Sequence, residues 1–162
     1  MTDTVRHRIW FGNTVGYLGC YLSSGVMLPP LQAAIASKSE KEPANILLNF
    51  VQTGFTYQTD DEQFGYEKPF FVDELFYYPA CDCEDRSVLF NYLVRTLISL
   101  DVVLLDYPNP IATAVCFNED VKGDYVTLNG KPYIICDPTF INASVGQSRP
   151  QYKNAQVEVI RF

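Results

Sequence analysis

The chain has 162 residues, a formal net charge of −7 and a pI near 4.6. Hydrophobic residues make up 48% of it and aromatic residues 14%, which is typical of one globular domain with a sizeable core. An acidic chain lacks the attraction to phosphate that supplies most nucleic-acid affinity, so this charge excludes nucleic acid and anionic membranes as favoured partners.

The first part of the chain, residues 1–42, is expected to be an N-terminal arm with one short helix. Residues 5–22 mix large apolar side chains with three glycines, a pattern that favours an extended, partly buried arm over a helix. The sequence Leu28-Pro29-Pro30-Leu31 predicts a helix that runs to about Ser37, because proline is tolerated in a first turn.

A second helix is predicted from Pro43 to about Gly54. Its apolar residues recur with helical spacing: Ile46, Leu47, Phe50, Val51 and Phe55. Residues 56–71 show no period and predict a loop, in which the acidic run Asp60-Asp61-Glu62 is interpreted as solvated. Loops of this length often form functional sites.

The longest predicted helix begins at Cys83 and ends near Ser99. Asp82 is a favourable N-cap, and Asp85 stands where a capping box needs its second carboxylate. The apolar stripe of this helix consists of Leu89, Phe90, Leu93, Leu97 and Leu100.

Strand character dominates after this helix. Strands are predicted over 102–105, 111–117, 125–128 and 133–136, with a last one over 157–162. Asn129-Gly130 is a two-residue hairpin signal, so the strands on either side of it are expected to be antiparallel. Helices followed by a run of strands predict an α+β fold with the sheet packed on the central helix.

Cys83 is the candidate nucleophile. At a helix N-terminus the unpaired backbone N–H groups and the helix dipole favour thiolate over thiol. The carboxylates of Asp82, Glu84 and Asp85 favour the thiol instead, so a cation would be needed nearby. The alternative is a buried, inert cysteine at the start of a core helix.

Three motifs together resemble the transglutaminase-like family, which has a papain-like cysteine protease fold. They are the helix-opening Cys83, the segment Ile111-Ala112-Thr113-Ala114-Val115, and Cys136-Asp137-Pro138-Thr139. The resemblance covers about residues 43–142, and it implies a single domain over 1–162 with residues 143–162 as a C-terminal extension. It also implies that Cys83 is the nucleophile and that Asp137 orients a histidine base.

The histidine itself is missing. The resemblance places it at position 110, where this chain has Pro110, and proline cannot accept a proton. The one histidine of the chain is His7, on the N-terminal arm. Without an imidazolium beside it, Cys83 is expected to keep an ordinary or raised pKa and to react poorly at neutral pH.

Two other residues near these motifs have plain structural interpretations. An aspartate before proline, such as Asp137, commonly forms a turn through hydrogen bonds to the backbone. Arg86 is expected to pair with Glu84 or to face solvent, and a guanidinium cannot act as a base.

No metal or cofactor is expected. The chain has five cysteines, an odd number without the spacing of a disulfide scaffold, so reduced thiols are predicted. Cys81 and Cys83 form one close pair, whereas structural zinc sites usually have two; Cys116 and Cys136 are interpreted as core residues. The ligand pattern of a calcium loop and the fingerprints of nucleotide sites are also missing from the sequence.

The sequence therefore predicts a transglutaminase-like domain with an incomplete triad, impaired or inactive as an enzyme, that acts as a binding or structural module. Its partner is expected to be a protein or peptide. The alternative is an active thiol acyltransferase or cysteine peptidase that uses Cys83 with an unconventional base, either His7 or a carboxylate. No apolar run is long enough to span a membrane and no signal-peptide pattern opens the chain, which predicts a soluble and, by default, cytoplasmic protein.

Overall fold

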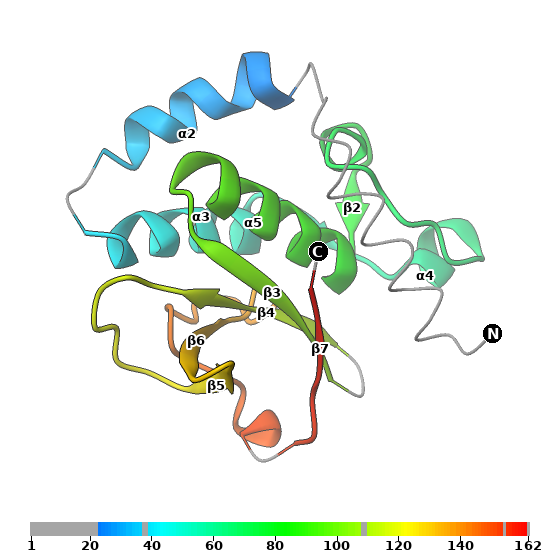
Figure 1. The fold of residues 1–162 in the computed structure, drawn as a ribbon. Coiled ribbons are helices and arrows are strands. Elements are labelled where there is room, and N and C mark those ends of the chain that lie inside the picture. Colours follow the sequence, from blue (N-terminus) through cyan, green and yellow to red (C-terminus); the bar gives the residue numbers. More distant parts are fainter. Residues whose placement is uncertain (1–22, 37–38, 108–109, 154, 162) are drawn as a thin grey trace.

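A computed structural model describes residues 23–36, 39–107, 110–153 and 155–161 (Figure 1). Helices lie against one face of a curled antiparallel sheet, so the predicted α+β class is confirmed. Within these residues no helix combines the length and the apolar character that crossing a membrane requires. The arm predicted over residues 5–22 lies outside the described part of the chain.

The helical segments follow the predicted order with shifted ends. They are η1 (Ser23–Met27), α2 (Leu28–Ala34), α3 (Lys41–Thr53), α4 (Asp60–Phe64), η2 (Glu74–Phe76), α5 (Cys83–Leu97) and η3 (Pro150–Tyr152). The helix predicted from Pro43 begins at Lys41, and the central helix ends at Leu97 rather than near Ser99. The short helix that follows residue 28 ends at Ala34 and continues a π-helical turn that the sequence did not indicate.

The prediction of a loop over residues 56–71 holds for residues 65–71 and was wrong for the residues before them. This stretch contains strand β1 (Thr56–Tyr57) and helix α4, which a capping box between Thr59 and Glu62 opens and Gly65, with a φ of 75°, ends. Asp60 lies in the first turn of α4 and is buried, so it is not the solvated residue that was predicted. The capping signal was present in the sequence, but a helix of one turn has too little periodicity to reveal itself.

The main sheet has the strand order β5-β6-β4-β3-β7, with every neighbouring pair antiparallel. Its strands are β3 (Asp101–Asp106), β4 (Ile111–Cys116), β5 (Tyr125–Leu128), β6 (Lys131–Cys136) and β7 (Glu158–Ile160). Asn129 and Gly130 both have positive φ, at 52° and 77°, as the two-residue turn between β5 and β6 requires. The predicted hairpin is thereby confirmed.

The two faces of the sheet bury different partners. Residues of one face, among them Val102, Leu104 and Val115, join the apolar cluster that includes α3 and α5. Alternate residues of the same strands, such as Val103 and Ala114, join a second cluster that the chain from Tyr152 to Val159 covers. The C-terminal extension is thus part of the packed fold.

A small second sheet joins α3 to α5. Strand β1, which follows α3, pairs in parallel with β2 (Ala80–Cys81), which immediately precedes α5, and Tyr57 lies opposite Cys81. This pairing brings the end of α3 to the beginning of α5, where Cys83 lies.

The buried guanidinium of Arg86 also connects the end of α3 to the beginning of α5. Its side chain is 1% exposed, and its terminal nitrogens donate to the carbonyl oxygens of Gln52 at 3.3 Å and of Phe55 at 2.6 Å. Gln52 lies in the last turn of α3, whose carbonyls have no partner within the helix. The expectation that Arg86 pairs with Glu84 or faces solvent was therefore wrong, because the fold directs it to α3.

Two glycines touch backbone to backbone beside the hairpin. A Cβ atom on Gly123 would lie 2.3 Å from the Cα of Gly146, and both residues have positive φ. Asp124 N–H donates to the Gly146 carbonyl at 2.8 Å, and Gly146 N–H donates to the Ile135 carbonyl at 2.8 Å. Only glycine at both positions permits this approach between the segments that precede β5 and follow β6.

Replacing Arg86 with Met is expected to lower the free energy of unfolding by about 2 to 4 kcal/mol, because two buried carbonyls lose their donors while the volume stays similar. Urea unfolding followed by circular dichroism measures this. Lys122→Met is the matched control, since Lys122 forms an exposed ion pair with Asp120, and it should change stability by no more than about 0.5 kcal/mol. Equal effects of the two substitutions would contradict the assigned role.

Candidate functional site

Cys83 is the first residue of α5, as predicted. Asp82 is the N-cap, and its Oδ1 accepts hydrogen bonds from the N–H groups of Glu84 at 3.1 Å and Asp85 at 3.3 Å. Asp85 Oδ2 accepts in return from Asp82 N–H at 3.4 Å. The predicted capping box is therefore formed.

The thiol of Cys83 is buried and makes a hydrogen bond to a carboxylate. The side chain is 4% exposed, and its Sγ donates to Oε2 of Glu84 at 2.8 Å. The Tyr57 hydroxyl also hydrogen-bonds with this thiol. All three groups therefore meet at the N-terminus of α5.

The pKa of Cys83 is raised well above the ordinary value for a thiol. Burial is the largest cause, followed by the negative charge of Glu84 and the hydrogen bond to it, while the backbone N–H of Ile111 acts in the opposite direction. The thiol is consequently protonated at neutral pH, which agrees with the direction expected from its acidic neighbours.

Buried carboxylates surround this thiol. Burial and the charge of Glu84 raise the pKa of Asp60, although the hydrogen bond from Lys68 N–H acts in the opposite direction. Burial with the charges of Glu84 and Asp85 raises the pKa of Asp82. Burial likewise raises the pKa of Asp85 to about 7. Like charges gathered out of water disfavour ionisation, so this end of α5 holds protons at pH values where exposed carboxyls have lost them.

Two groups of side chains here have the geometry to hold a cation. Ligand atoms of Asp60, Glu67 and Asp82 lie within 4.8 Å of one another, and so do those of Asp82, Cys83 and Glu84. Three carboxylates are fewer than the roughly six to eight oxygen ligands that Ca²⁺ takes, and Lys68 N–H already occupies Asp60 Oδ2 at 2.6 Å. The four described cysteines, Cys81, Cys83, Cys116 and Cys136, are free thiols.

The start of strand β4 lies against the N-terminal turns of α5. Besides the contact between Ile111 N–H and Cys83, the hydroxyl of Ser87 donates to the Ile111 carbonyl at 3.2 Å. Pro110 directly precedes Ile111, so the position that the resemblance assigns to the histidine is one residue away from the backbone group that touches the thiol.

Asp137 directly follows β6, which is the neighbour of β4 in the sheet. Pro110 and Asp137 thus flank adjacent strands, Pro110 before one and Asp137 after the other. Cys136 lies opposite Thr113 in the register and accepts a hydrogen bond from the Thr113 hydroxyl at 2.6 Å. These contacts fix where β6 ends and where Asp137 begins its turn.

The carboxylate of Asp137 is fully engaged. Its Oδ1 accepts from the N–H and hydroxyl of Thr139 at 2.9 and 2.7 Å and from Phe140 N–H at 3.0 Å. Its Oδ2 accepts from Nε of Arg149 at 2.9 Å, and the side chain is 3% exposed. The turn-forming interpretation of Asp137 therefore describes its observed contacts.

Sequence reasoning missed Arg149 and Tyr57. Arg149 lies in the C-terminal extension and Tyr57 in the stretch interpreted as a loop, and neither belongs to a recognisable motif. Arg149 reaches Asp137 because the C-terminal extension folds back onto the sheet. Tyr57 reaches Cys83 because β1 pairs with β2. His7 lies outside the described residues, which contain no histidine.

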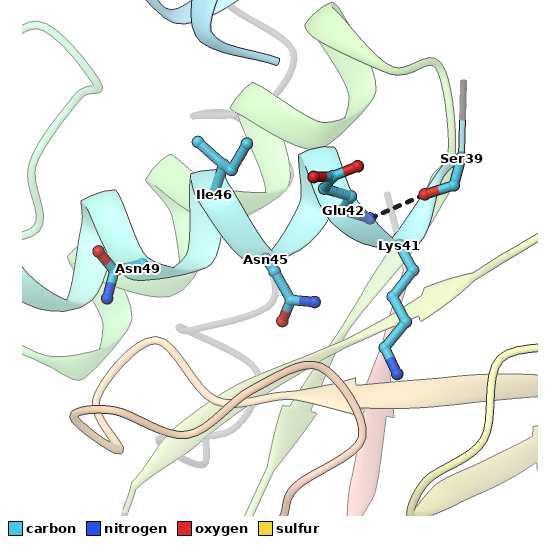
Figure 2. A pocket seen from close by; sticks show the side chains of 6 residues that line it. All are labelled: Ser39, Lys41, Glu42, Asn45, Ile46 and Asn49. Carbon is cyan, nitrogen blue, oxygen red and sulfur yellow. Dashed lines mark hydrogen bonds between the residues drawn. The ribbon is translucent and has the colours of Figure 1, made fainter. Parts of the chain in front are cut away.

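Two cavities among the described residues lie away from Cys83. One hollow, of about 470 Å³, lies along α3. Figure 2 shows the side chains that line it: Ser39, Lys41, Glu42, Asn45, Ile46 and Asn49. Another, of about 250 Å³, lies near the Tyr107 and Tyr152 rings, whose centroids are 5.0 Å apart. None of the residues lining these two hollows belongs to the predicted site.

No family model, curated protein or solved structure matches the chain. The resemblance to the transglutaminase-like family is therefore carried by Cys83, the β4 segment and the Asp137-Pro138-Thr139 turn alone.

Removing one charge from the carboxylate cluster should stabilise the protein at neutral pH. Because folding raises the pKa of Asp82 and Asp85, the folded state holds more protons than the unfolded state, so their contribution to stability falls as pH rises from about 4 toward 7. Asp82→Asn keeps the N-cap acceptor without the charge. Its melting temperature should exceed that of the wild type by about 4 °C at pH 7.5 and by less than about 1 °C at pH 4.

Asp120→Asn is the control, because Asp120 is 79% exposed and forms a surface ion pair with Lys122. It should leave the melting temperature within about 1 °C of the wild type at both pH values. A stabilisation by Asp82→Asn that is equal at pH 4 and pH 7.5 would show that the carboxylates do not repel one another.

Proposed function

We propose that this chain is a transglutaminase-like domain of papain-like fold whose thiol chemistry is impaired or lost, and that it acts as a binding or structural module. One observation carries the proposal: the Cys83 thiol is buried and donates to the Glu84 carboxylate at 2.8 Å. The hydrogen-bond partners described for this thiol are a carboxylate, a phenol and a backbone amide, none of which is a cation. A nucleophilic thiolate needs the opposite setting.

The order of elements supports the family part of the proposal. A cysteine opens the central helix, the following antiparallel pair includes a strand whose first residue touches that cysteine, and an aspartate ends the neighbouring strand. This is the order in which the family presents its nucleophile, its base and the residue that orients the base. At the base position stands Pro110.

The contacts of Asp137 support the loss of activity. In a working triad the aspartate accepts a hydrogen bond from the imidazole and stabilises its charge. Here Arg149 supplies a guanidinium to Oδ2, and Thr139 and Phe140 occupy Oδ1. The carboxylate of Asp137 therefore has structural hydrogen-bond partners where a working triad has an imidazole.

The second candidate function is an active thiol acyltransferase or cysteine peptidase with a carboxylate as base. Glu84 favours it, because its Oε2 is close enough to accept the thiol proton and leave a thiolate. The two candidates assign opposite effects to the same carboxylate: in the first Glu84 suppresses the thiolate, and in the second it generates it.

Alkylation of Cys83 by iodoacetamide separates these candidates. The wild type should react slowly at pH 7, and Glu84→Gln should raise the rate about tenfold or more, because removing the negative charge lowers the thiol pKa. Peptide mapping by mass spectrometry distinguishes Cys83 from Cys81, whose pKa burial raises to about 11. Rapid alkylation of the wild type at pH 6, or a loss of reactivity in Glu84→Gln, would overturn the proposal.

Pro110→His tests the missing base directly. Placing an imidazole before β4 should shift the pH profile of Cys83 alkylation to lower pH, since an imidazolium stabilises the neighbouring thiolate. The change also frees a backbone N–H and relaxes φ, so circular dichroism must first show that the fold is intact. Pro110→Gln is the matched control, with a polar side chain that carries no titrating group and is expected to leave the profile unchanged.

A further inference from the structure

The acidic charge of the protein is concentrated in one stretch, residues 55–86. It contains nine acidic residues and only two basic ones, Lys68 and Arg86, so it carries a formal charge of −7. The remainder of the chain has ten residues of each sign and is neutral. The net charge of the protein is thus a property of this stretch.

The same stretch exposes aromatic side chains. Among the described residues eight large hydrophobic side chains are exposed, and five of them lie here: Tyr57, Tyr66, Phe71, Phe76 and Tyr77. Tyr77 is 82% exposed and Tyr66 60%. Figure 1 shows this stretch at the right of the molecule, around α4 and β2 and away from the main sheet. We call these five side chains, together with the exposed carboxylates of Asp61, Glu62 and Glu67, the aromatic–acidic surface.

One buried ring, Phe70, and two partly buried rings, Phe64 and Tyr78, support the exposed ones. Phe70 stacks on Tyr78 with ring centroids 4.7 Å apart, and Phe64 packs edge-on against both. Tyr66 contacts Phe64 at 6.2 Å and Tyr77 contacts Tyr78 at 5.2 Å. The two most exposed rings are therefore connected through one packed cluster, which holds them in place before any partner arrives.

Both cations of this stretch already rest on aromatic rings. Lys68 Nζ lies 4.6 Å from the ring centroids of Phe70 and Tyr78, and the Arg86 guanidinium carbon lies 5.4 Å from that of Tyr57. Rings backed by carboxylates bind cations through the ring quadrupole and through charge. The cation–π contacts of Lys68 and Arg86 within the protein are thus of the same kind as those by which its surface can recognise a partner.

We propose that the aromatic–acidic surface docks a cationic polypeptide segment, one rich in Lys or Arg, in a partner protein. This inference rests on the proposed function and names the partner of its binding role. A polypeptide fits better than a metal ion because the exposed groups are mostly rings, which stack on guanidinium groups and bury lysine stems. The exposed carboxylates of Asp61, Glu62 and Glu67 supply the electrostatic complementarity.

The probe is a fluorescein-labelled nine-residue peptide of Gly-Lys-Arg repeats, and the control peptide has Gln in place of each Lys and Arg. Fluorescence anisotropy at low ionic strength should show saturable binding of the cationic peptide and none of the control. Raising NaCl from 50 to 300 mM should weaken the binding at least about fivefold, because salt screens exposed charges.

Matched variants locate the binding surface. Tyr77→Ala should weaken binding about fivefold or more, whereas Tyr125→Ala should change it less than twofold, since Tyr125 is equally a solvent-exposed tyrosine, 60% exposed, but lies on β5. Asp61→Asn should weaken it by about twofold, and the exposed Asp120→Asn should leave it unchanged. All four side chains are exposed, so these variants should retain the fold.

Absence of saturable binding up to 1 mM peptide would overturn the proposal. Equal losses in Tyr77→Ala and Tyr125→Ala would do the same, because they would reveal attraction to overall charge alone. The alkylation of Cys83 is measured on the same samples: an unreactive thiol with no peptide binding would reject this docking surface and leave the loss of thiol chemistry standing.

Discussion

The buried guanidinium of Arg86 connects the parts of this molecule that the sheet does not hold. Projecting from α5, it donates to carbonyls at and beyond the end of α3 and lies over the ring of Tyr57 in β1. The stretch of residues 55–86, which carries the aromatic–acidic surface, begins beside these carbonyls and ends at this arginine. Because Arg86 connects the two ends of this stretch, the position of Cys83 depends on a buried cation.

At the N-terminus of α5, the charges that stabilise the helix also disfavour a thiolate at Cys83. Asp82 and Asp85 complete a capping box, which stabilises the helix, and Glu84 in the first turn is favourable toward the helix dipole. The charges of Glu84 and Asp82 raise the pKa of the Cys83 thiol, which the dipole would otherwise lower. In this chain the acidic residues around Cys83 stabilise the N-terminus of α5, and the cysteine donates a hydrogen bond to Glu84.

Local signals carried the prediction where the chain is regular. The N-cap before Cys83, the Asn129-Gly130 turn and the strand runs each depend on neighbours in sequence, so their positions were predictable. Contacts between distant segments were not: Arg149 reaches Asp137 from the extension, and Arg86 reaches α3 rather than a helix neighbour. The one-turn helix α4 was not predicted because a capping box and the hydrogen bond from Lys68 N–H to Asp60 hold it in place, rather than a repeating apolar face.

The contact between Gly123 and Gly146 has a consequence for recognising kin of this protein. A side chain at either position would collide with backbone that cannot yield, so any chain that keeps this crossing must keep both glycines, whatever happens to its thiol. A profile weighted on this glycine pair and on the Asn129-Gly130 turn between them would find relatives by their architecture, whatever residues stand at the positions of Cys83 and Asp137.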